Sequence, residues 1–155
     1  MNRRTMFLLA AVAALALSQP AMANDPTITG KWELNVAASK TTGTMPKSVT
    51  RTYEATRDHE KMNATVITAD GKTVESSFDA AYDGKDHPWK GPEGDTISIT
   101  KVDPLTNSFI IKRDGKVVLT GNRTLAKDGK TMTLTSKGTN AEGKPIEATM
   151  VYDRK

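Results

Sequence analysis

Apolar and polar residues alternate along most of the chain after residue 24, in runs of about five to ten residues. This period of two predicts β-strands that bury one face and expose the other. The runs predict nine strands, near residues 29–36, 48–56, 61–69, 73–82, 95–102, 107–113, 116–126, 130–138 and 145–153. Nine successive strands favour an all-β, antiparallel up-and-down meander that closes, or nearly closes, into a barrel of about 8–10 strands, because closure removes unpaired edges.

The turns between these runs repeat one tripeptide. Asp-Gly-Lys occurs four times, at residues 70–72, 83–85, 114–116 and 128–130. Asp-Gly favours tight hairpin turns, since these turns need positive φ, which Gly adopts freely. If Asp128-Gly129 forms a two-residue turn, Leu125 lies beside Met132 and Arg123 lies beside Leu134. This count points Arg123 into the barrel.

The turn at Asp114-Gly115 leaves the facing of its two strands open. The same count pairs Ile111 with Val118 and Ile110 with Leu119, so both faces are apolar. A bulged turn would reverse the facing.

Residues 1–23 have the order of a secretory signal peptide. Arg3 and Arg4 give a positive start, an apolar run follows from Met6 to Leu17, and Ala21-Met22-Ala23 is a small-x-small cleavage site. The apolar run is shorter than the roughly 20 residues of a transmembrane helix. We therefore expect cleavage before Asn24 and a single periplasmic or secreted domain over residues 24–155, without an integral membrane segment. The export route, general or twin-arginine, stays open.

Composition excludes several classes of function. The chain has no Cys, which removes disulfides and thiolate chemistry. Its net charge of +4 falls to +2 once the two leader arginines are removed, and it has only three Phe, three Tyr and two Trp. A basic face studded with aromatic residues, as in nucleic-acid binding, is therefore not expected.

Catalytic and metal-binding patterns are also missing. The sequence has no Gly-x-Ser-x-Gly, phosphate-cradling Gly loop or His-Glu-x-x-His, so we expect no enzyme activity, cofactor or metal. His59, between Asp58 and Glu60, is interpreted as part of a solvated turn and not as a metal ligand. His87 and Asp86 would suit a base and its orienting acid, but no nucleophile or oxyanion donors accompany them.

Several residues are candidates for contact with a ligand. Alternation turns three aromatic residues inward, namely Tyr53, Phe78 and Tyr82. Trp89 lies in the stretch 85–94, expected to be a long loop, where it would either lid a cavity or fold down over the barrel end. Arg51 is expected inward, where it would hold a ligand's head group or reach solvent from a strand end.

Gly30-Lys31-Trp32, at the start of the first strand, resembles the Gly-x-Trp motif of the lipocalin superfamily. The likeness is to small exported bacterial lipocalin-like (calycin-type) β-barrel proteins of unassigned function, and it continues in residues 82–86 and 127–133. The resemblance implies that Trp32 closes one end of the barrel and that Arg123 packs over its ring. It implies a fold and a compartment, but no activity.

A barrel of this size encloses either packed side chains or one small ligand. We therefore predict a non-enzymatic β-barrel that binds a small, mostly apolar molecule in its interior. The alternative is a structural or interaction module of the cell envelope with a filled barrel and no small ligand. The sequence leaves the oligomeric state open.

Overall fold

The computed structural model describes residues 27–155, so the expected leader and its cleavage site at Asn24 lie outside the described residues. Eleven strands and one short 3-10 helix, η1 (Val36–Ala38), make up the described chain. The strands are β1 (Gly30–Leu34), β2 (Lys40–Thr41), β3 (Ser48–Ala55), β4 (His59–Ile67), β5 (Thr73–Ala81), β6 (His87–Lys90), β7 (Thr96–Asp103), β8 (Thr106–Arg113), β9 (Lys116–Leu125), β10 (Thr131–Thr139) and β11 (Pro145–Arg154).

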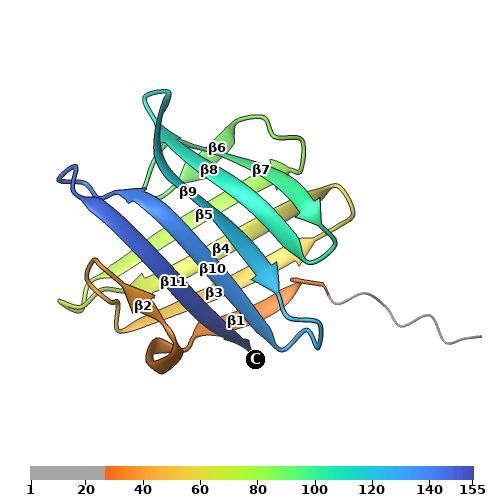
Figure 1. Ribbon diagram of the computed structural model, residues 1–155, viewed down its shortest axis with the longest axis horizontal. Helices are drawn as coiled ribbons and strands as arrows, with labels where there is room; N and C mark the ends of the chain where they lie inside the picture. The colour runs from red at the N-terminus through yellow and green to blue at the C-terminus, as the bar shows by residue number, and fades with distance from the viewer. Residues whose placement is uncertain (1–26) are drawn as a thin grey trace, which may run out of the picture.

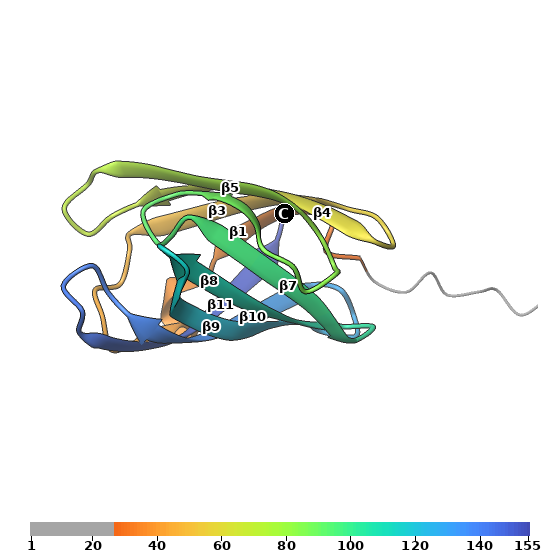
Figure 2. The ribbon, with the colours of Figure 1, turned by 90° about the horizontal axis from the view of Figure 1, so that it is seen from above.

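The strands form one antiparallel sheet that closes on itself. Each strand from β3 to β10 pairs with the next along the chain, and β1 pairs with both β3 and β11. These ten strands make the closed barrel, and β2 adds a short eleventh strand beside β11. The barrel is flattened, with β3, β4 and β5 in one layer and β8–β11 in the other (Figures 1 and 2). The predicted fold class, an up-and-down meander closed into a barrel, is confirmed.

All nine predicted strands are present, but two short strands were not predicted. β2 follows η1, and β6 lies inside the stretch 85–94 that was expected to be a loop. Alternation in the predicted strand 29–36 puts Val36 on the inward face with Trp32 and Leu34. Val36 is instead 42% exposed, because the chain leaves the first strand there and enters η1. Period-two alternation predicts the direction of a side chain only within a strand, so it does not apply beyond the strand's last residue.

The two hairpins analysed from the sequence behave differently. At Asp128-Gly129 the register is as predicted, with Leu125 opposite Met132 and Arg123 opposite Leu134. At Asp114-Gly115 both turn residues have positive φ, 50° and 72°, as a two-residue hairpin turn requires.

A bulge next to that turn then shifts the pairing by one residue, so that Ile111 lies opposite Leu119 instead of Val118. Ile111 is buried, while Ile110 and Val117 on the other face are 37% and 56% exposed. The bulge therefore decides which face of β8 points inward.

Candidate functional site

The barrel interior contains a buried ion pair between β4 and β9. Arg123 Nη1 donates to Glu60 Oε1 at 2.7 Å, and Nη2 donates to Oε2 at 2.5 Å. Glu60 is completely buried and Arg123 is 6% exposed. The Tyr82 hydroxyl donates to Glu60 Oε2 at 2.7 Å, and the Arg123 guanidinium lies 4.9 Å from the centre of the Tyr53 ring. The two buried charges thus form a bidentate ion pair.

The burial of Glu60 corrects the sequence interpretation of this segment. Asp58–Glu60 was expected to be a solvated turn, but β4 begins at His59. Glu60 shares the inward face with Met62 two residues later, because side chains at i and i+2 point the same way. His59, on the outer face, instead places its Nε2 against Asp79 Oδ1 of β5. Within residues 27–155 no three metal-ligating side chains gather.

The cation that covers Trp32 is Arg154, which corrects the expectation of Arg123. The Arg154 guanidinium lies 4.2 Å from the centre of the Trp32 ring. Trp32 and Arg154 are opposite each other where β1 pairs with β11, whereas Arg123 is held by Glu60. Trp32 is fully buried, and its Nε1 donates to the carbonyl oxygen of Ile28 at 2.8 Å.

A second interior arginine, Arg51 of β3, has a different environment. Its Nε donates to the Tyr152 hydroxyl at 3.1 Å, and its Nη1 donates to the Tyr53 hydroxyl at 3.4 Å. Its guanidinium lies 5.3 Å from the centre of the Tyr152 ring. Among the described residues no carboxylate forms an ion pair with Arg51. Burial alone lowers the pKa of Arg51, but the two tyrosines raise it above its usual value, so the cation persists.

A cavity of about 60 Å³ lies beside these arginines inside the barrel. One wall is the Phe78–Trp89 pair, whose rings are stacked with centroids 5.7 Å apart. The polar residues that line the cavity are Arg51, Tyr53, Glu93, Asn107 and Arg123. The volume has room for no more than a few water molecules, whereas sites for drug-sized ligands measure roughly 300–1,000 Å³.

Four of the five residues expected to contact a ligand line this cavity together: Arg51, Tyr53, Phe78 and Trp89. Trp89 is 8% exposed and sits in β6, inside the barrel wall and not in a loop. Tyr82 lies outside the cavity lining. Its hydroxyl binds Glu60, and Lys101 Nζ lies 4.4 Å from the centre of its ring.

Glu93, between β6 and β7, was not singled out from the sequence. Its Oε2 accepts from Trp89 Nε1 at 3.1 Å and from Ser76 Oγ at 3.3 Å. No periodicity marks a loop residue as inward, so only the folded chain could have revealed it. The nearby His87 also differs from expectation, since its Nε2 lies 2.8 Å from Asp83 Oδ1 while Asp86 binds Lys112. The bond to His87 lowers the pKa of Asp83.

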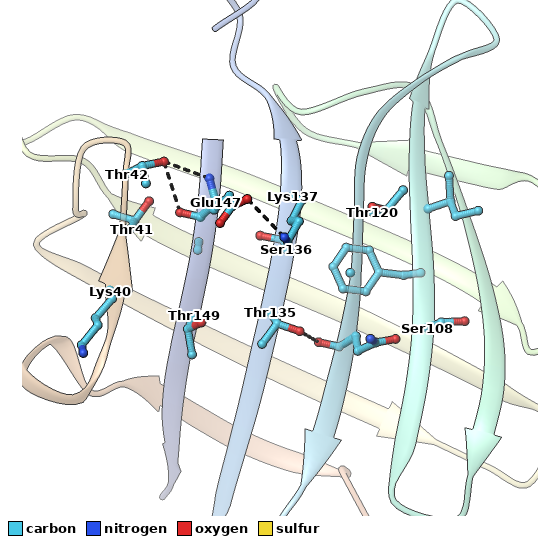
Figure 3. A pocket seen from close by; sticks show the side chains of 15 residues that line it. Lys40, Thr41, Thr42, Ser108, Thr120, Thr135, Ser136, Lys137, Glu147 and Thr149 are labelled. Carbon is cyan, nitrogen blue, oxygen red and sulfur yellow. Dashed lines mark hydrogen bonds and ion pairs between the residues drawn. The ribbon is translucent and has the colours of Figure 1, made fainter. Parts of the chain in front are cut away.

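The outer face of the barrel carries a larger groove of about 730 Å³ over β8–β11 and β2 (Figure 3). Threonine, serine and charged side chains project into it, among them Thr120, Thr135 and Thr149. Its Lys137–Glu147 ion pair is 76% and 61% exposed. Because the lining of the groove has no buried polar group and only one aromatic residue, Phe109, the interior cavity is the better candidate site.

The geometry defines the chain as a closed antiparallel barrel with a charged and aromatic interior. Neither a protein-family model nor a curated protein sequence matches it. A solved structure of the siderocalin Ex-FABP, described as functioning through dual ligand specificities, aligns with 11% sequence identity and a TM-score of 0.38 over 83% of this chain and 70% of that chain. Within the described residues no helix is long and apolar enough to cross a membrane.

Tyr82 and Tyr152 should resist ionisation at alkaline pH. Burial raises the pKa of both, and the carboxylate of Glu60 raises that of Tyr82 further. The pKa of each tyrosine in the folded protein lies above the unfolded value of about 10. The contribution of each neutral tyrosine to the stability of the folded protein is therefore complete below pH about 10 and is lost as pH rises further. The phenolate absorbance measured against pH, with Tyr82→Phe and Tyr152→Phe to assign the signals, checks this. Ionisation of either residue at its ordinary pKa would contradict it.

Proposed function

We propose that this protein is an exported, non-enzymatic β-barrel that binds a small, mostly apolar molecule in its interior. The observation that carries the proposal is the interior cavity with the Phe78–Trp89 wall on one side and a few polar groups on the other. Binding sites for small molecules have this composition, with apolar walls and a few polar groups that fix the orientation.

The small volume of the cavity means that a ligand must displace part of the wall. β6 is the best candidate for this displacement, because only two of its residues pair with β5 and only two pair with β7. By contrast, nine residue pairs join β4 to β5. A ligand that moves β6 outward takes the place of the Trp89 side chain next to Phe78.

Titration with fatty acids, isoprenoids and small aromatic compounds should therefore quench the fluorescence of Trp89. Trp89→Phe should abolish most of the change. Trp32→Phe is the matched control, because it removes the other tryptophan and leaves the cavity wall intact. The emission of this variant, which comes from Trp89, should still be quenched. If no compound shifts the fluorescence or the melting temperature, binding in the interior is excluded.

That last result would favour the second candidate, an interaction module of the cell envelope with a filled barrel. The observation in its favour is the cavity volume of about 60 Å³, which the protein's own side chains leave free. The exposed apolar residues Val102 and Val117, at 62% and 56%, are then the two separate positions to examine first.

Export is the part of the proposal that depends on the leader. The mature protein should begin at Asn24, because Ala21 and Ala23 satisfy the small-residue rule for cleavage. Intact-mass measurement on periplasmic or secreted material checks the start. A retained leader, or a start far from residue 24, would remove the assigned compartment and leave the proposed interior binding unaffected.

A further inference from the structure

We infer that the interior ligand carries an anionic group, with a carboxylate as the simplest case, and that Arg51 is its anchor. The inference rests on the proposed interior binding and adds the chemical class of the ligand. It follows from the partners of the interior arginines, from the unused donors beside Arg51, and from the position of Glu93.

Arg51 differs from the other two arginines that point into or cap the barrel. Arg123 has the carboxylate of Glu60, and Arg154 donates to the carbonyl oxygens of Gly129 at 2.7 Å and Thr29 at 2.6 Å. Arg51 has only two neutral hydroxyls. A half-buried guanidinium without a counter-charge is costly for a folded protein, and an anion from solution removes that cost.

The hydroxyl of Tyr53 extends the anion site, because Tyr53 lines the cavity with Arg51, whereas Tyr152 is not part of the lining. The hydroxyls of Tyr53 and Tyr152 both accept from Arg51, so each keeps its own O–H to donate. Within the described part of the chain neither O–H donates to another group. Arg51 and the phenol of Tyr53 therefore offer donors from two side chains to one planar oxygen pair, the arrangement that suits a carboxylate.

Glu93 explains how the site stays closed without a ligand. Its carboxylate lines the same cavity but is bonded to Trp89 and Ser76, beyond ion-pair distance from Arg51. Glu93 and Trp89 are four residues apart and bonded to each other, so they leave the cavity together when β6 moves. The negative charge of Glu93 then leaves the cavity, and an acidic ligand supplies a negative charge in its place.

Three probes of equal chain length test the inference by calorimetry on the mature protein: decanoate, decanol and decylammonium. Decanoate should bind at least about 10-fold more tightly than decanol, and decylammonium should bind most weakly. This comparison uses the unmodified protein, so it does not depend on the folding of any variant.

Variants then assign the charge. Arg51→Gln should abolish the preference for decanoate over decanol. Arg57→Gln removes the same charge from an exposed position and should leave the preference unchanged. Glu93→Gln should tighten decanoate several-fold, because it removes the competing negative charge.

The outcomes separate this inference from the proposed function. If none of the three probes binds, the proposed interior binding fails and the inference fails with it. If decanol binds as tightly as decanoate, or decylammonium binds best, interior binding stands and the anion site at Arg51 is wrong. If the preference for decanoate survives Arg51→Gln in a folded variant, Arg51 is not the anchor.

Discussion

Arg123→Ala should destabilise the barrel by about 3–5 kcal/mol, because it leaves the carboxylate of Glu60 charged and unpaired inside the protein. Glu60 is fully buried, and its only other side-chain partner among the described residues is the hydroxyl of Tyr82. The free energy of unfolding, measured by urea denaturation, checks the size of the loss.

Two controls separate the cost of an orphaned charge from the loss of an ordinary ion pair. Lys137→Ala breaks the exposed pair with Glu147 and should cost no more than about 1 kcal/mol. The double variant Glu60→Met with Arg123→Met removes both charges and should recover much of the stability lost in Arg123→Ala. A loss below about 1 kcal/mol for Arg123→Ala would show that Glu60 finds water or another partner.

Trp32→Ala should cost a similar amount, about 3–5 kcal/mol, because it leaves a large cavity in the core. The side chain is completely buried, and its ring carries the guanidinium of Arg154. The substitution therefore removes the packing of the ring, the hydrogen bond from Nε1 to Ile28, and the aromatic face under Arg154. Urea denaturation again gives the loss, and Trp32→Phe should retain part of the stability.

An exposed apolar residue serves as the control for this truncation. Val102 is 62% exposed, so Val102→Ala should change the free energy of unfolding by less than about 0.5 kcal/mol. A loss below about 1 kcal/mol for Trp32→Ala would mean that the Trp32 ring does not support the core. Arg154→Ala should also destabilise the barrel, because it removes the cation that covers the Trp32 ring. An unchanged free energy of unfolding for Arg154→Ala would contradict the contact between Arg154 and Trp32.

The candidate site was only partly within reach of the sequence. Alternation placed Arg51, Tyr53 and Phe78 on inward faces, and all three line the interior cavity. The same reasoning was available for Glu60, but its neighbours Asp58 and His59 suggested a turn. Glu93 gave no local signal, because it lies in a loop and reaches the cavity only through its bonds to Trp89 and Ser76.

The sequence by itself determined the strands and most of their turns. Period-two alternation and Asp-Gly turns depend on neighbours a few residues apart, which is why the nine longer strands and the register at Asp128-Gly129 followed from them. β6 was not predicted, because it has only four residues and contains a proline, so no alternation can be recognised in it.

Only the tertiary structure decided which charged groups meet. Arg123 and Glu60 are 63 residues apart, and Trp32 meets Arg154 because β1 and β11 close the barrel. Alternation tells which side of a strand a residue occupies, but not which residue of a distant strand faces it across the interior. Arg51 can therefore be identified as the interior arginine without a carboxylate only from the closed barrel, in which Arg123 binds Glu60 and Arg154 covers the Trp32 ring.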